Sequence, residues 1–261
     1  MAMTTTVYRE FPPSPKFAAH IECFWHHSSV DPVRDYPVLP DGCSDIIFEQ
    51  PARDYGGLAI VGTMTHAHAF DIPARQSTFG VRFRPGMAPR LLRVPGSLAV
   101  DRSIPLADAW KSSAVRELLE QLAETNSTHN SARNSPRDSI ALIEAALAAP
   151  APLDPFEKAL AWLVETSGQI SIDALAGAAS LSSRQFRRTC LDRTGLTPKR
   201  LARILRFRHA ATQAKKGRRD WADLALACGY YDQAHLINEF RELSGMSPVQ
   251  FTILAASSPL S

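Results

Sequence analysis

An internal repeat in the C-terminal part of this chain constrains its fold more than any other feature. The first copy runs from Ile172 to Pro198, and the second runs from Trp221 to Pro248. The Gly-Leu-Thr-Pro run that begins at Gly195 recurs 50 residues later as Gly-Met-Ser-Pro, whereas the beginning of each copy recurs at a spacing of 49 residues. One additional residue near Tyr231 accounts for the difference. Such a repeat indicates one supersecondary unit used twice.

The pattern within each copy is typical of a helix-turn-helix unit. A short first helix is followed by a tight turn, in which Gly229 of the second copy suits the positive φ of a helix C-terminus. Ser182 and Asp232 suit the N-caps of the second helices. The small side chains of Ala225 and Ala227 are expected where the first helix crosses the second closely. The sequence therefore predicts two helix-turn-helix units.

The second helix of each copy divides into an inner and an outer face. Phe186 and Cys190 recur at the helical period in the first copy and are predicted to point inward. Leu236 and Phe240 take the same places in the second copy. The opposite faces carry mainly arginine and amide side chains, which are the groups that hydrogen-bond to base edges in a DNA major groove. These outer side chains are Arg184, Arg187, Arg188, Gln233, Ala234, His235, Asn238 and Arg241.

Basic residues are concentrated around the repeat. Between Arg184 and Arg219 the sequence has 13 basic residues and one acidic residue, Asp192. A local excess of this kind is expected of a protein that binds a polyanion, although charge alone leaves a solvated basic face as an alternative. A single helix from Pro198 to Lys216 is predicted to join the units, so that both second helices enter successive major grooves about 34 Å apart.

The second unit carries many residues at fixed spacing, and they identify a family. They are Leu224-Ala225, Cys228-Gly229-Tyr230, the run Asp232 to Leu236, Phe240-Arg241, Gly245, Ser247-Pro248 and Phe251. Together with the first unit and the joining helix, this arrangement resembles the DNA-binding domain of the AraC/XylS family of transcription regulators. The resemblance covers about Phe156 to Phe251.

The resemblance implies a set of DNA contacts. Base contacts are implied for Arg184, Arg187, Arg188, Gln233, Ala234, His235 and Asn238. Phosphate contacts are predicted for Ser183, Lys199, Arg200, Arg206 and Arg241; alternatively, the basic residues of the joining helix only solubilise it. Two positions depart from the family. Cys190 stands where a large apolar residue is usual, and Asn238 replaces a frequent Arg, so the second unit is expected to contribute less base recognition.

The first half of the chain has the pattern of a β domain. Short apolar runs at Asp45–Phe48, Leu58–Val61 and Phe79–Phe83 are separated by turn-forming residues, which predicts a small barrel or sandwich. From Pro105 to Glu124 the apolar period becomes helical, and the polar run from Thr125 to Ser135 is predicted to be an exposed loop.

The N-terminal half also resembles an uncharacterised domain found on some AraC-type regulators. The matching segments are 22–25, 39–48, 61–62 and 80–86. The resemblance implies a cupin-like β-barrel and names no ligand. The predicted fold class is α+β: a sensor or dimerisation domain over residues 1–125, a linker with a short helix over 126–154, and an all-α tandem helix-turn-helix domain over 155–255.

Polar and aromatic groups near the predicted strands form a hypothetical effector pocket. They are Trp25, His26, Asp41, Cys43, Asp45 and Arg82. Structural roles are the alternative: Asp41-Gly42 is typical of a turn, and Asp45 could pair with Arg82. His66 and His68 would share one face of a strand and could ligate a metal with Cys43 or His26. No third ligand has a diagnostic spacing, so no metal site and no cofactor is predicted.

The expected function is sequence-specific transcription regulation without enzymatic activity. The expected partners are double-stranded DNA, a small-molecule effector, RNA polymerase for an activator, and a second copy in a homodimer. Two alternatives remain, namely an N-terminal domain that only dimerises, and a regulator fused to a Cys-dependent DNA-repair enzyme. The sequence shows no apolar run of roughly 20 residues and no secretion signal, so a cytoplasmic protein without membrane contact is expected.

Overall fold

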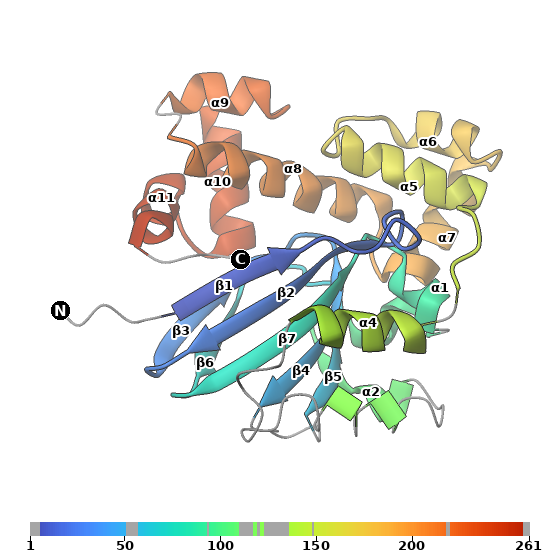
Figure 1. Cartoon of the computed structure of the whole chain (residues 1–261). Helices are drawn as coiled ribbons and strands as arrows, with labels where there is room; N and C mark the ends of the chain where they lie inside the picture. The colour runs from blue at the N-terminus through green and yellow to red at the C-terminus, as the bar shows by residue number, and fades with distance from the viewer. Residues whose placement is uncertain are drawn as a thin grey trace.

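The computed structural model describes residues 6–50, 57–92, 94–109, 117–118, 121–122, 136–147, 149–217 and 220–257. A β-sheet domain is followed by a helical region that lies along one side of it (Figure 1). The predicted α+β class is confirmed. The predicted helix from Pro105 to Glu124 and the predicted loop from Thr125 to Ser135 fall largely or wholly outside the described residues.

The described strands form two antiparallel sheets. The bounds are β1 (Thr6–Phe11), β2 (Ile21–Ser29), β3 (Val33–Val38), β4 (Ser44–Gln50), β5 (Leu58–Val61), β6 (His68–Ile72), β7 (Gln76–Phe83) and β8 (Ser103–Pro105). Six strands pair in the order β1-β2-β7-β4-β5-β8, and β3 pairs with β6. The three predicted apolar runs are confirmed as parts of β4, β5 and β7. The expected barrel is not confirmed, because these strands form two open sheets.

Side-chain alternation gives the six-stranded sheet two different faces. Phe24 of β2 and Ile46 of β4 both pair with Val81 of β7, and all three are buried in one core. Since neighbouring residues on a strand point to opposite faces, Trp25, Asp45 and Arg82 lie on the other face. Polar groups are thereby gathered opposite the core.

Short helices cover the apolar face of the six-stranded sheet. They are α1 (Ala88–Leu92), α2 (Leu106–Ala109), α4 (Pro136–Ala146) and the 3-10 helix η1 (Gly96–Ala99). Leu91 of α1 and Ile143 of α4 belong to the same buried cluster as Phe24, and Figure 1 shows one end of α4 beside β7. The short helix predicted within residues 136–147 is therefore confirmed, and it packs with the β domain.

In the described part of the C-terminal region, seven helices pack around a second core. They are α5 (Pro155–Glu165), α6 (Ile172–Ala178), α7 (Ser183–Thr194), α8 (Pro198–Lys215), α9 (Trp221–Ala227), α10 (Gln233–Ser244) and α11 (Pro248–Ser257). The two predicted helix-turn-helix units are α6–α7 and α9–α10, joined by α8. Among the described residues, no helix is long and apolar enough to cross a membrane.

Candidate nucleic-acid interface

Local sequence signals fix where α7 and α10 begin and end. Ser182 caps α7 by accepting a hydrogen bond from the Gln185 backbone, and Asp232 caps α10 by accepting one from the His235 backbone. Both helices end at a left-handed glycine, Gly195 or Gly245, each with φ of 73°. The predicted caps are confirmed, and the matched ends give the two helices the same length of 12 residues.

The inner faces of both helices are buried as predicted. Phe186 and Cys190 of α7 are fully buried, and so are Leu236 and Phe240 of α10. One prediction about the helix crossing is wrong: Ala227 is exposed, and the buried position is the next residue, Cys228. Ala227 lies two residues after the buried Ala225, which is about 200° around the helix, so its side chain faces away from the core.

The outer faces present most of the predicted base-reading side chains to solvent. The exposed ones are Arg184, Arg187, Arg188, Gln233, Ala234 and Asn238. His235 differs because it is half-buried: the Tyr231 backbone N–H donates to its Nδ1 at 3.4 Å, and its ring lies edge-on to Tyr230. This imidazole supports the turn, so its contact with a base stays a prediction with a competing structural role.

Helix α8 holds the two units together. Its 18 residues include Leu201, Ile204 and Phe207, which are buried in the core shared with both units. Phe207 packs edge-on against Phe240 of α10, with ring centroids 5.0 Å apart. One continuous helix therefore joins the two units that carry the outer faces.

The predicted phosphate contacts divide into two groups. Lys199 and Arg241 are exposed. Ser183 donates to Asp173 at 2.5 Å, and Arg206 lies over the Tyr230 ring. The guanidinium of Arg200 donates to Glu242 at 3.0 Å and to the Thr65 carbonyl at 2.7 Å. Arg200 is thus engaged with its own chain, and its phosphate contact stays a prediction.

Several other basic residues of the charge run hold ion pairs. Arg203 binds Glu239 and Glu242, and its Nε donates to Glu239 at 2.7 Å. Arg208 forms an ion pair with Glu22 of β2. Burial would raise the pKa of Glu22, but Arg208 holds it below its ordinary value. The idea that these arginines only solubilise the helix is wrong for both, because carboxylates elsewhere in the chain face them.

The segment from residue 62 to 68 joins the β domain to both units. Thr63 Oγ1 donates to the Thr194 carbonyl at the end of α7, at 3.3 Å. The Ala67 backbone N–H donates to the Leu243 carbonyl near the end of α10, at 2.7 Å. Between them, Arg200 of α8 reaches Thr65. Sequence reasoning gave no signal for these contacts.

A cavity lies between the two sheets of the β domain. Its volume is about 330 Å³, and its lining includes Tyr8, Trp25, Asp45, Phe70 and Arg82. Trp25, Asp45 and Arg82 were predicted pocket residues, and the structure brings them together. Trp25 Nε1 donates to Asp45 Oδ1 at 2.7 Å, and Arg82 Nε lies 3.5 Å from the same oxygen. The predicted pairing of Asp45 with Arg82 is confirmed.

Burial is the largest single influence on the pKa values of Asp45 and Arg82 in this cavity. It raises the pKa of Asp45 to about 6, although Arg82 acts in the opposite direction. For Arg82, burial disfavours the charge, but Asp45 and Asp41 together hold its pKa above the ordinary value. The cavity therefore contains a cation whose carboxylate partner can be neutralised near neutral pH.

Three of the predicted pocket residues do not line this cavity. His26 points to the other face of β2, where its Nε2 lies 2.9 Å from Ser77 Oγ. Asp41 forms a turn by accepting from the Cys43 backbone N–H at 2.8 Å. Cys43 is buried beside Arg208, and burial raises the pKa of its thiol. The turn role of Asp41 and the buried structural role of Cys43 are the better descriptions.

One cluster in the described part of the chain has the donor set of a metal site. It consists of His66, His68 and Asp101, whose ligand atoms lie within 4.8 Å of one another. The sequence suggested Cys43 or His26 as partners of the two histidines, and this was wrong. The third residue is Asp101, which follows η1 and lies 33 residues after His68.

Two family models match separate parts of the chain. Residues 9–105 match a domain of unknown function, DUF6597, and residues 175–252 match a helix-turn-helix domain. The transcriptional activator RhaS of Escherichia coli O1:K1 is 34% identical over 90 residues, which are 34% of this chain and 32% of that protein. The chain thus aligns with about a third of the length of the curated relatives it matches.

Two solved structures are similar to parts or most of this chain. The DNA-binding domain of AdpA, crystallised with a target DNA, is 26% identical and covers 42% of this chain and all of that one, with a TM-score of 0.38. ToxT of Vibrio cholerae O395 is 10% identical and covers 97% of this chain and 98% of its own, with a TM-score of 0.46.

Proposed function

Because this chain carries an AraC-type helix-turn-helix domain behind a DUF6597 domain, we propose that it is a sequence-specific DNA-binding transcription regulator. The observation that carries the proposal is the pair of exposed outer faces on α7 and α10, held by one helix, α8. AraC-type regulators are a non-enzymatic family. The buried Cys43 and Cys190 agree with this, because burial raises the pKa of both thiols and opposes the thiolate that a repair enzyme needs.

The two faces divide the recognition unequally. Arginine forms bidentate hydrogen bonds with guanine, and Arg184, Arg187 and Arg188 offer three such groups on α7. On α10, Gln233 and Asn238 suit adenine, and Ala234 suits a thymine methyl group. The first unit should therefore supply most of the discrimination. Lys199 and Arg241 are exposed beside these faces and would hold phosphates.

The cavity between the sheets is the proposed effector site. Its volume is within the range of about 300–1,000 Å³ that is usual for small-molecule pockets. Its aromatic walls favour a flat or apolar molecule, and an anionic group on that molecule would bind Arg82 by displacing Asp45 from it. Binding there would shift the population of DNA-binding arrangements of a homodimer, with contacts to RNA polymerase for an activator. A domain that only dimerises is the alternative.

Gel-shift titration against DNA from the gene's own upstream region tests DNA recognition. We expect binding that weakens steeply with salt and that exceeds binding to random DNA by about 10³-fold or more. Equal affinity for both DNAs would contradict the proposal.

Replacing Arg187 by Ala tests the role of α7. We expect discrimination at one base pair to fall by about 1–3 kcal/mol, measured by competition among single-base variants of the site. Lys199→Ala is the matched control, because loss of a phosphate contact should weaken all sequences alike. A uniform loss for Arg187→Ala would instead make Arg187 a phosphate contact.

A thermal-shift screen of the full chain tests the effector site. Aromatic and aliphatic carboxylates should raise the melting temperature of the natural protein. Arg82→Gln should abolish the shift, since it removes the cation of the cavity. If no compound changes the melting temperature, the domain that only dimerises is the better hypothesis.

A further inference from the structure

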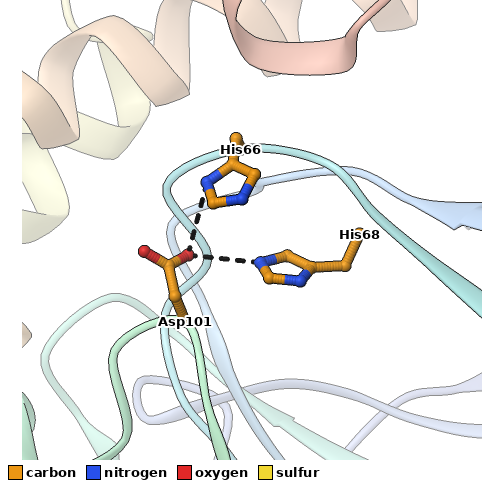
Figure 2. Close-up of side chains that lie close together, drawn as sticks. All are labelled: His66, His68 and Asp101. Carbon is orange, nitrogen blue, oxygen red and sulfur yellow. Dashed lines mark hydrogen bonds and ion pairs between the residues drawn. The ribbon is translucent and has the colours of Figure 1, made fainter.

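Three side chains converge where the β domain contacts the helix-turn-helix units. His66 precedes β6, His68 is its first residue, and Asp101 follows η1. The two imidazoles stack with ring centroids 4.6 Å apart. Both direct a nitrogen at the same oxygen, as Figure 2 shows: His66 Nδ1 lies 3.9 Å and His68 Nε2 lies 3.4 Å from Asp101 Oδ1.

We propose that His66, His68 and Asp101 form a binding site for a divalent transition-metal ion. Two imidazoles and one carboxylate are ligands that zinc binds at about 2.0–2.2 Å, with a fourth position left for water. The same donors suit other first-row ions. The three ligand atoms already lie within 4.8 Å of one another, so small side-chain rotations are sufficient to close the site.

Direct hydrogen bonds to Asp101 do not account for the approach of the two imidazoles. At 3.9 Å, the distance from His66 Nδ1 to Asp101 Oδ1 is too long for a hydrogen bond, and the 3.4 Å distance from His68 makes a weak one. Neither imidazole is well bonded to that oxygen, and His66 Nδ1 instead lies 3.1 Å from Thr65 Oγ1, which itself donates to Asp101. A metal ion held by the three side chains would replace this contact of His66 with Thr65.

Surrounding groups hold the carboxylate in position. The Thr65 backbone N–H and hydroxyl both donate to Asp101, each at 2.7 Å. Such outer contacts orient the ligands of metal sites. The His66 side chain is 54% exposed, whereas His68 and Asp101 are 29% and 27% exposed, so an ion can enter from solvent on the His66 side.

A metal ion at this site would affect how the β domain contacts the helix-turn-helix units. Residues 63, 65 and 67 of the same segment contact α7, α8 and α10. A metal bound by His66 and His68 would fix this segment to the turn at Asp101. It would thereby fix the β domain against both helix-turn-helix units. The effect on DNA binding rests on the proposed function, whereas metal binding itself does not.

Equilibrium dialysis of the untagged full chain against zinc tests the site. We expect one zinc ion per chain at micromolar zinc. Loss of an outer contact typically weakens metal binding by about 10–100-fold. His66→Ala and Asp101→Asn each remove a direct ligand, so each should weaken zinc binding by more than that. His209→Ala is the matched control, because His209 is half-buried on α8, outside the cluster, and its loss should leave binding unchanged.

Two results would overturn the site: no stoichiometric zinc in the natural chain, or unchanged binding by His66→Ala. The exposed position of His66 makes that variant decisive even where Asp101→Asn does not fold. Asn at position 101 also tolerates the positive φ of 53° found there.

Hydrogen exchange and gel shifts test whether zinc binding fixes the segment 62–68 and changes DNA affinity. Zinc should slow exchange in the segment 62–68 of the natural chain and change its DNA affinity by about 5-fold or more, the lower end of typical coupling. Neither change should occur in His66→Ala. A DNA affinity that does not respond to zinc would overturn the coupling. Absence of any specific DNA binding would overturn the proposed function while the dialysis result still decides the metal site.

Discussion

The carboxyl group of Asp45 lies in the cavity between an indole donor and a guanidinium. Trp25 Nε1 donates to Asp45 Oδ1 at 2.7 Å, and burial raises the pKa of Asp45 to about 6. In the unfolded chain the pKa of an aspartate is about 3.9. Because the folded state holds the proton to higher pH, Asp45 contributes stability that is complete below about pH 4 and is lost as the pH rises through about 6.

Tryptophan fluorescence should therefore report the ionisation of Asp45. We expect a transition with a midpoint near pH 6 in the natural chain and none in Asp45→Asn, whose amide keeps the acceptor for Trp25. The free energy of unfolding of the natural chain should fall relative to the variant by at most about 3 kcal/mol from pH 4 to pH 7, at about 1.36 kcal/mol per pKa unit. Parallel pH profiles for the two proteins would show that Asp45 does not titrate in this range.

At the scale of the element, Gly195 and Gly245 form a natural comparison. Both end a recognition helix with φ of 73°, so a side chain costs each of them the same left-handed strain, about 1–2 kcal/mol. Their surroundings differ. A Cβ on Gly195 would come within 2.2 Å of Val100 Cγ2 in the β domain, whereas a Cβ on Gly245 meets no described atom within 4 Å.

Gly195→Ala should therefore destabilise the full chain more than Gly245→Ala. Crowding against Val100 adds about 1–3 kcal/mol to the strain that the two variants share. Urea unfolding of the two proteins measures the difference. If both variants lose the same stability, α7 does not pack against the β domain in solution as it does in this structure.

The sequence predicts the bounds of single helices and strands better than it predicts how distant elements pair. The starts of α7 and α10 followed from Ser182 and Asp232, because capping depends on residues within one turn. Parts of β4, β5 and β7 followed from short apolar runs separated by turn-forming residues. Closure of the sheet did not, because it depends on pairing between distant strands, and the described strands leave the expected barrel open. The sequence could not identify Asp101 as the partner of His66 and His68, because Asp101 is distant in the chain and close only in space.

For the whole molecule, opposite charges meet across the two domains. Residues 1–154 carry 14 basic and 17 acidic residues, whereas residues 155–261 carry 15 and 9. Glu22 with Arg208, and Arg90 with Glu157, join the two parts. The basic run is visible in the sequence, where it predicts either contact with a polyanion or a solvated basic face. The partners could not be identified because Glu22 and Arg208 are 186 residues apart in the chain.

A double-mutant cycle on Glu22 and Arg208 should measure how strongly the domains are coupled. The side chains are 19% and 33% exposed, so solvent screens their attraction only in part. We expect a coupling energy of about 0.5–3 kcal/mol from urea unfolding of the natural chain, Glu22→Gln, Arg208→Gln and the double variant.

The control cycle is Arg34 with Asp71, which are 78% and 55% exposed within the β domain and should couple by only about 0.2–1 kcal/mol. Equal coupling in both cycles would mean that the contact between the domains is no firmer than an ordinary surface pair. A larger value for Glu22 and Arg208 would mean that the β domain and the helix-turn-helix units are held as one body, which is what transmission from the cavity to the recognition helices requires.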